Sequence, residues 1–193
     1  MCYTEIERLG AMKMIYVFLA NGFEELEAIA PVDILKRSRI PLKTVGVGGK
    51  VISGSLGIEI TADITIEEVK KEDIEGIILA GGMPGTDNLY ANEKIRDIVN
   101  YCAERNILIA AICAAPSILG KMGILENKFA CCYPGFEESL KGAKISDSLV
   151  CSDKNIITAK GPGAATEFGF KILEYLKNDK AAEVVKKSMQ FRI

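Results

Sequence analysis

Short apolar runs alternate with amphipathic segments along most of the chain, and this alternation constrains the fold more than any other feature. Strands are expected at 14–20, 42–47, 76–79 and 107–112. Helices are expected at 24–37 and 93–104, because apolar residues recur there at the spacing of one helical face. Parallel strands joined by crossover helices produce this pattern, so the sequence predicts a doubly wound α/β sandwich.

Two stretches interrupt the alternation. Residues 50–63, KVISGSLGIEITAD, contain the Gly and Ser residues typical of a small antiparallel excursion. Residues 148–160 predict a hairpin that turns at 153–155, and we expect both stretches to decorate one sheet. The chain is expected to close with helices near 164–177 and 180–188.

Length and composition limit the classes of protein to consider. A chain of 193 residues is one domain of ordinary size, and we assign it to 14–193. Residues 1–13 are treated as a leader, either disordered or the product of a misassigned start, because Met12 offers a second start. With 26% charged residues and a net charge of -2, the chain has no electrostatic reason to bind nucleic acid or an anionic membrane. No apolar run approaches the roughly 20 residues that cross a bilayer, so we expect a cytoplasmic protein.

The cysteines do not resemble a metal site. They are Cys2, Cys102, Cys113, Cys131, Cys132 and Cys151. Their spacing matches no zinc pattern, and the chain contains no His, the commonest metal ligand and general base. Neither a metal nor another cofactor is therefore expected. We interpret the thiols other than Cys2 and Cys113 as reduced side chains that behave as small hydrophobic residues.

Cys113 lies where an expected strand meets an expected helix, in LIAAICAAPSILG. A side chain at such a turn is exposed at the sheet edge and faces the free N–H groups of the next helix, which lower a thiol pKa modestly. These groups, together with the N–H groups of Gly81 and Gly82, could receive a developing oxyanion. The competing interpretation is a small buried residue between strand and helix.

Three acidic residues, Glu24, Glu25 and Glu27, crowd the first turn of the first helix. Acids in that position are usually solvated, and we expect this of two of them. Glu27 is the best placed to reach Cys113: ionised, it would raise the thiol pKa, and protonated, it could donate a hydrogen bond to the thiolate. Such a carboxyl must be partly buried. Pro31 should bend or restart the helix and could turn the carboxyl inward.

The stretch AKGPGAATEFGF places Gly161 and Gly163 before an expected helix. Such a turn could cradle a phosphate, but Gly-Pro-Gly turns more often only start a helix.

Four motifs in order resemble a known family: NGFEELEAIAPVDILKRS, LAGGMPGTDNL, IAAICAAPSIL and AKGPGAATEFGFKILEYL. They are similar to the ThiJ/PfpI superfamily, and most closely to its DJ-one-like branch. The resemblance implies an α/β flavodoxin-like three-layer sandwich with a mainly parallel central sheet, and a homodimer. It also implies a reactive Cys113 on a nucleophile elbow, a protonated glutamate at Glu27, and an oxyanion site formed by the backbone amides of Gly82 and Ala114. Arg37 and Pro162 match positions that line the family's pocket or dimer seam.

The chain departs from the family pattern at two positions. Protease-like members have a histidine directly after the cysteine, where this chain has Ala114, and no other residue supplies an imidazole. The sequence therefore argues strongly against a Cys-His hydrolase. Some members with glyoxalase or deglycase activity carry a histidine where this chain has Tyr133. Tyrosine is a poor base at neutral pH, and this weakens the case for glyoxalase or deglycase activity, although Glu27 could still shuttle a proton.

Two hypotheses follow from these residues. In the first, the protein is a stress-response enzyme of glyoxalase or deglycase type, whose Cys113 attacks a small carbonyl compound or a glycated substrate while Glu27 moves protons. In the second, it is a non-enzymatic redox sensor or chaperone-like protein whose Cys113 is oxidised to sulfinic acid.

Overall fold

The computed structural model describes residues 13–191, so the predicted leader lies outside the described residues except for Lys13. A seven-stranded sheet forms its centre. Its strands are β1 (Met14–Ala20), β2 (Leu42–Val47), β5 (Ile64–Thr65), β6 (Ile74–Leu79), β7 (Leu108–Ile112), β10 (Val150–Asp153) and β11 (Ile156–Ala159). Their order across the sheet is β10-β11-β7-β6-β1-β2-β5, and every pair is parallel except β10 with β11. The predicted mainly parallel sandwich is confirmed.

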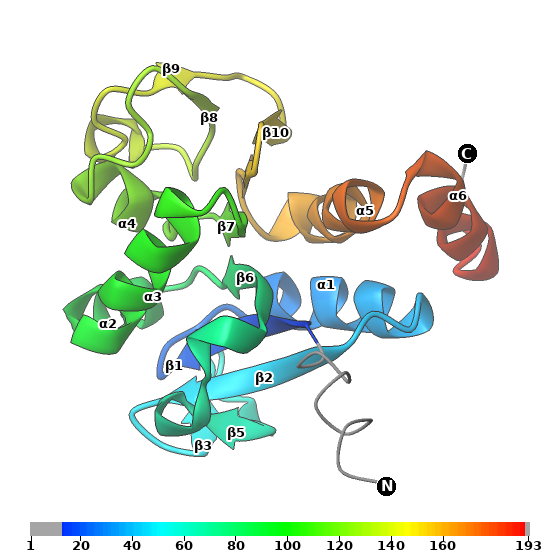
Figure 1. Ribbon diagram of the computed structural model, residues 1–193, viewed down its shortest axis with the longest axis horizontal. Helices are drawn as coiled ribbons and strands as arrows, with labels where there is room; N and C mark the ends of the chain where they lie inside the picture. The colour runs from blue at the N-terminus through cyan, green and yellow to red at the C-terminus, as the bar shows by residue number, and fades with distance from the viewer. Residues whose placement is uncertain (1–12, 192–193) are drawn as a thin grey trace, which may run out of the picture.

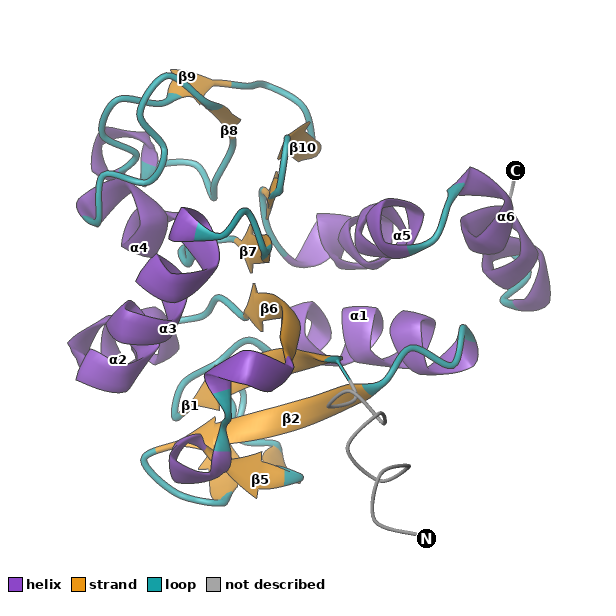
Figure 2. Ribbon diagram, in the orientation of Figure 1, coloured by secondary structure: helices purple, strands orange, loops and turns teal. Residues whose placement is uncertain are grey.

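Helices cover both faces of the sheet (Figure 1). One face carries α1 (Glu25–Arg37), α5 (Ala165–Leu176) and α6 (Asp179–Ser188), and the other carries α2 (Gly85–Ala91), α3 (Glu93–Glu104) and α4 (Pro116–Lys121). Figure 2 shows the three layers as two sets of helices with the strands between them. The central strands β1 and β7 are continuous apolar runs because both of their faces are buried, and each face of the sheet forms its own hydrophobic core.

Two helical predictions differ from the structure. The sequence analysis did not predict α2, whose residues GTDNLYA contain several that favour turns; packing of buried Leu89 against the core outweighs that tendency. The expected restart at Pro31 is wrong, because α1 runs through it as one helix. Pro31 lies where α5 crosses α1: a Cβ built on Gly169 would be 3.0 Å from the Pro31 Cα, so glycine permits the close approach.

The two interrupting stretches take different positions. Antiparallel pairing of β3 (Val51–Ser53) with β4 (Glu59–Thr61) confirms the excursion, but the pair is a sheet of its own and does not join the main one. The predicted hairpin is β10 and β11, which do extend the main sheet. A further small sheet, formed by β8 (Phe129–Ala130) and β9 (Lys144–Ile145), lies outside the main sheet.

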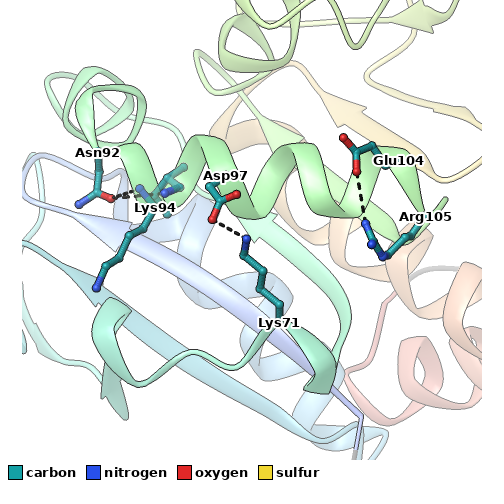
Figure 3. A network of polar contacts seen from close by, with 7 residues as sticks. Lys71, Asn92, Lys94, Asp97, Glu104 and Arg105 are labelled. Carbon is teal, nitrogen blue, oxygen red and sulfur yellow. Dashed lines mark hydrogen bonds and ion pairs between the residues drawn. The ribbon is translucent and has the colours of Figure 1, made fainter.

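Polar contacts hold α3 in place (Figure 3). The Asn92 side chain caps its start by accepting hydrogen bonds from the backbone N–H groups of Lys94 at 3.0 Å and Ile95 at 3.3 Å. Lys71, in the turn that precedes β6, forms an ion pair with Asp97 in the middle of the helix. The Lys71–Asp97 ion pair joins the β5–β6 connection to the helix beside it. None of the helices within residues 13–191 is long and apolar enough to cross a membrane.

Candidate active site

Four neighbouring parallel strands deliver their loops to one edge of the sheet. These strands are β11, β7, β6 and β1, and their carboxyl ends lead to Gly161, Cys113, Gly81 and the start of α1. After β1 the chain continues to β2 on one side of it, whereas β6 lies on its other side, so the strand order reverses at β1. Ligands of open α/β sheets bind at such a reversal, beyond the carboxyl ends of the strands. The contacts described below show that these loops converge.

Cys113 occupies a strained turn between β7 and α4. Its φ of +64° lies in the left-handed region, which costs a non-glycine residue about 1–2 kcal/mol. Main-chain hydrogen bonds hold the turn from both sides: the Cys113 N–H donates to the Ala159 carbonyl at 2.9 Å, and the Tyr133 N–H donates to the Cys113 carbonyl at 2.9 Å. The side chain is half-buried, so the thiol is both fixed and accessible.

Glu27 is fully buried in the first turn of α1. Burial is the main reason that its pKa rises to about 7, and the nearby charge of Glu24 adds to the rise. The Cys113 thiol and the Gly81 backbone N–H lie against the carboxyl and lower the pKa, although neither oxygen has a hydrogen bond of full geometry. Near neutral pH this carboxyl can therefore either take or give a proton.

The thiol of Cys113 is held as a neutral group. Burial, followed by the charge and hydrogen bonding of Glu27, raises its pKa to about 12. The backbone N–H groups of Gly82 and Ala114 act in the opposite direction, because they face the sulfur and stabilise its negative charge. Their effect does not outweigh burial. The thiol therefore loses its proton only when a base accepts it, and the base in contact with it is Glu27.

Gly81 separates the carboxyl from the thiol. A Cβ added there would lie 2.4 Å from Oε2 of Glu27 and 2.6 Å from the Cβ of Cys113, so only glycine leaves room for both. Gly82 has a φ of +87°, and a Cβ there would meet the Glu24 backbone nitrogen at 2.4 Å. The two glycines of this loop thus permit backbone amides to approach the sulfur.

An apolar hollow adjoins the site. It has a volume of about 200 Å³ and is lined by Tyr133, Pro134, Leu149, Lys160, Gly161, Pro162, Gly163 and Ala164. The built Cβ position of Gly161 lies 3.9 Å from Oε1 of Glu27 and 3.1 Å from the Tyr133 ring, which links the hollow to the carboxyl. Gly163 lies in the short turn Pro162–Ala164, and α5 begins at the next residue, so the Gly-Pro-Gly stretch precedes a helix as expected.

Arg37 is not brought to this site. It lies in the last turn of α1, about 15 Å beyond Glu27 at the rise of an α-helix, and pairs with Asp33 at 2.7 Å on the surface. The structure of a single chain therefore does not place Arg37 in the pocket. The alternative, that Arg37 lies at a dimer seam, stays a prediction. The other predicted residues, Cys113, Glu27, Gly81, Gly82, Ala114, Tyr133 and Pro162, do gather around the sulfur and the adjoining hollow.

Glu25 has a role that the sequence analysis missed. The expectation of a solvated side chain is wrong, because Glu25 is only 7% exposed. Its Oε1 accepts hydrogen bonds from the backbone N–H groups of Leu56 at 2.9 Å and Ile58 at 3.4 Å, and Ser55 donates to Oε2 at 3.3 Å. Although burial raises its pKa, these donors bring the net value below the usual one. Glu25 thus fastens the tip of the β3–β4 hairpin to the start of α1, and no local pattern signals this.

Comparisons with known proteins agree with the geometry. Residues 13–175 match the model of the DJ-1/PfpI family. The chain is 34% identical to Protein dj-1beta of Drosophila melanogaster over 178 residues, covering 90% of this chain and 95% of the relative. It is 31% identical to the Glutathione-independent glyoxalase DJR-1.2 of Caenorhabditis elegans, covering 88% and 91%. The structure of oxidized Toxoplasma gondii DJ-1 superposes with a TM-score of 0.90 at 28% identity, covering 94% of this chain and 100% of that one.

The family match spans β1 to α5 and so includes every loop that reaches the thiol. The fold, the strained cysteine and the sequence relatives agree, and the chain belongs to the DJ-1/PfpI family.

Proposed function

We propose that the protein is a cysteine-dependent enzyme of glyoxalase type that acts on small α-oxoaldehydes. The observation that carries the proposal is the contact between the Cys113 thiol and a buried carboxyl whose pKa is about 7. A general base works best when its pKa lies near the working pH, and Glu27 meets this condition in a chain without histidine. The relative named as a glutathione-independent glyoxalase supports the same chemistry.

The reaction begins as the Glu27 carboxylate takes the thiol proton and the Cys113 sulfur adds to the aldehyde carbon. The resulting oxyanion takes a proton to give a hemithioacetal. Glu27 then removes the proton from that former aldehyde carbon, and a proton on the neighbouring ketone oxygen completes an enediol. Protonation of the neighbouring carbon, with loss of the hydroxyl proton from the carbon that bears sulfur, gives a thioester of a 2-hydroxy acid. Water hydrolyses the thioester, releasing the acid and the free thiol. The net change is the substrate plus one water, with no external oxidant.

The surroundings of the sulfur suit this sequence of steps. The N–H groups of Gly82 and Ala114 face the sulfur and stabilise negative charge there as the proton leaves. The apolar hollow beside Tyr133 and Pro162 can take the carbon chain of a small substrate. Among the residues that the structure describes, Glu27 is the only side chain in contact with the thiol that is suited to move protons near neutral pH.

The test is turnover of methylglyoxal without glutathione, followed by measuring the 2-hydroxy acid formed. The wild-type protein is expected to release many equivalents of acid, Cys113→Ala none, and Glu27→Gln a rate lower by about 100-fold or more, the usual contribution of a general base. If each equivalent of wild-type protein consumes one equivalent of methylglyoxal or less, the proposal is overturned. Equal rates in wild type and Glu27→Gln would overturn the role of the carboxyl.

A second function is favoured by the same two amides. Because they already face the sulfur, they could donate hydrogen bonds to oxygens added to it, and the similar Toxoplasma gondii DJ-1 has been solved in an oxidized form. A redox sensor of this type would gain two oxygen atoms at Cys113 on exposure to peroxide, without turnover. Mass analysis of Cys113 after limited peroxide, compared with Cys113→Ala, separates this stoichiometric change from catalysis.

A homodimer in the cytoplasm completes the proposal. Leu26 and Ile29 lie one helical turn apart on α1 and are 60% and 42% exposed; on the hairpin tip fastened beside them, Leu56 and Ile58 are 80% and 58% exposed. Large apolar side chains gathered in this way favour burial against a second copy. The five described cysteines are free thiols, as suits a reducing compartment.

A further inference from the structure

Cys131 and Cys151 come together at the β10 edge of the main sheet. Cys151 lies in edge strand β10, directly opposite Thr158 in β11. Opposite residues of an antiparallel pair project to the same face. Thr158 also contacts Cys131, because its Oγ1 accepts a 2.9 Å hydrogen bond from the Cys131 N–H and donates to the Cys131 sulfur at 3.7 Å. One threonine therefore lies next to both cysteines.

The Cys131 sulfur rests on the backbone that carries Cys151. Its thiol donates to the Thr158 carbonyl at 3.4 Å and approaches the Leu149 carbonyl at 3.8 Å. The backbone N–H of Cys151 faces the same sulfur. The Cys131 sulfur therefore lies against the backbone of the residue with which it would pair. The Cys151 thiol faces the Ser146 side chain, so the Cys151 side chain must rotate for the two sulfurs to meet at bonding distance.

The other cysteines within residues 13–191 are placed differently. Cys102 and Cys132 are packed into the hydrophobic core on the α2–α4 side of the sheet, and Cys113 belongs to the active site. Cys132 is next in sequence to Cys131, but its sulfur faces the Phe136 backbone N–H. The contacts therefore single out one pair.

We propose that Cys131 and Cys151 are a dithiol pair that an oxidant converts to a disulfide, separately from the chemistry at Cys113. With a hydroperoxide, one thiolate attacks an oxygen, forming a sulfenic acid and releasing water or an alcohol. The second thiol then attacks that sulfur and displaces water. The two thiols lose two electrons and two protons, and the peroxide is reduced.

The structure indicates the order of attack. Cys151 is 9% exposed on the edge strand and Cys131 only 1%, so the oxidant reaches Cys151 first. Burial raises the pKa of both thiols, so the bond should form faster as pH rises.

The bond would act on the wall of the active-site hollow. Tyr133 and Leu149 both line this hollow, and each lies two residues from one of the paired cysteines. A disulfide would fasten the segment that carries Tyr133 to the edge strand. Oxidation at this pair would thereby fix the position of Tyr133, whose N–H donates to the Cys113 carbonyl.

The test oxidises the full-length reduced protein with diamide, which joins thiols without adding oxygen. Free thiols are then alkylated and the protein is digested with trypsin without reduction. Cleavage after Lys128, Lys141, Lys144 and Lys154 places the two cysteines on peptides 129–141 and 145–154. The expected result is one joined peptide pair that has lost two hydrogen atoms, with the linkage at Cys131 located by fragmentation.

Matched variants make the outcome specific. With diamide, the joined peptides should form in wild type, Cys113→Ala and Cys132→Ser. They should be lost completely in Cys151→Ser. Hydrogen peroxide should give the same bond in Cys113→Ala. Because Cys132→Ser retains the proposed pair, it decides the question even if Cys151→Ser fails to fold. Full alkylation of Cys131 and Cys151 in oxidised wild type, or a bond from Cys131 to Cys132, would overturn the proposal. Because the bond is expected to form in Cys113→Ala, which lacks the proposed nucleophile, the pair is tested independently of the proposed enzyme.

Discussion

The side-chain carboxylate of Glu24 accepts a 2.8 Å hydrogen bond from the backbone N–H of Glu27, so one glutamate caps the helix turn that carries the other. The contact has a second effect, because the negative charge of Glu24 raises the pKa of Glu27. Structural capping and electrostatic tuning of the proposed base therefore come from the same side chain.

Glu24→Gln should separate these two effects. The amide oxygen still accepts from the Glu27 N–H, but the charge is gone, so the pKa of Glu27 should fall. The rising limb of the pH profile of kcat/KM is then expected to move to lower pH by a fraction of a unit. Glu24→Asp, which keeps the charge, is the control. A movement to higher pH would contradict the assignment.

The stability of the fold should depend on the protonation of Glu27. Its pKa rises from 4.5 to about 7 on folding, so the folded state holds the proton more tightly and the stabilisation is present at low pH. It is lost as pH rises through about 7. Between about pH 5 and about pH 8, Glu27→Gln should gain roughly 2–3 kcal/mol relative to wild type in the free energy of unfolding. Urea unfolding of both proteins at each pH measures this, and a constant difference would argue against the raised pKa.

Gly81→Ala should damage the site and the fold together. The added Cβ would meet Oε2 of Glu27 at 2.4 Å and the Cβ of Cys113 at 2.6 Å, and overpacking of this kind costs about 1–3 kcal/mol. We expect a lower melting temperature and loss of methylglyoxal turnover. Gly49→Ala is the matched control, since its Cβ meets only the Val51 carbonyl at 3.7 Å. Equal behaviour of the two variants would show that Gly81 is not crowded.

Tyr133→His should give the proposed enzyme a second proton carrier. Tyr133 is 47% exposed on the wall of the hollow, so an imidazole would fit without being buried. The expected result is a higher kcat with a new limb in its pH profile near the histidine pKa of about 6.5. Tyr133→Phe supplies the comparison. If the histidine variant is no faster than the phenylalanine variant, proton transfer across the hollow does not limit the rate.

Leu26→Glu should separate the proposed dimer into monomers. The substitution places a charge in the exposed apolar surface of α1 beside the hairpin tip, where a second copy would have to desolvate it. Val184→Glu is the control, because Val184 is 61% exposed on α6 and outside that surface. Sedimentation velocity measures the masses. A wild-type monomer, or a dimer that survives Leu26→Glu, would rule out this interface.

The long strands β1, β2, β6 and β7 and the position of the thiol could be predicted because their signals are local. Runs such as Met14–Ala20 are buried on both faces and therefore uniformly apolar, and β1 has these bounds in the structure. The short helix at Gly85–Ala91 could not be predicted, because contacts with distant residues, and not its own composition, stabilise it.

The three glutamates of the first turn show a further limit. Glu24, Glu25 and Glu27 have similar sequence contexts, yet one caps the helix, one binds a hairpin and one faces the thiol. The roles of Glu25 and Glu27 depend on residues about 30 to 90 positions away in the chain, which single-sequence periodicity does not reveal. The same holds for the Cys113 pKa, where the extent of burial decides the net direction.

The left-handed backbone at Cys113 means that the fold gives up local stability at the position of the proposed nucleophile. Glycine or asparagine would occupy a φ of +64° with less strain, and neither could attack a carbonyl. The neighbouring main chain holds the turn through atoms that every residue possesses, so its shape does not depend on the side chain that it presents. A scaffold of this kind lets selection exchange the chemistry at one position while the surrounding architecture stays the same.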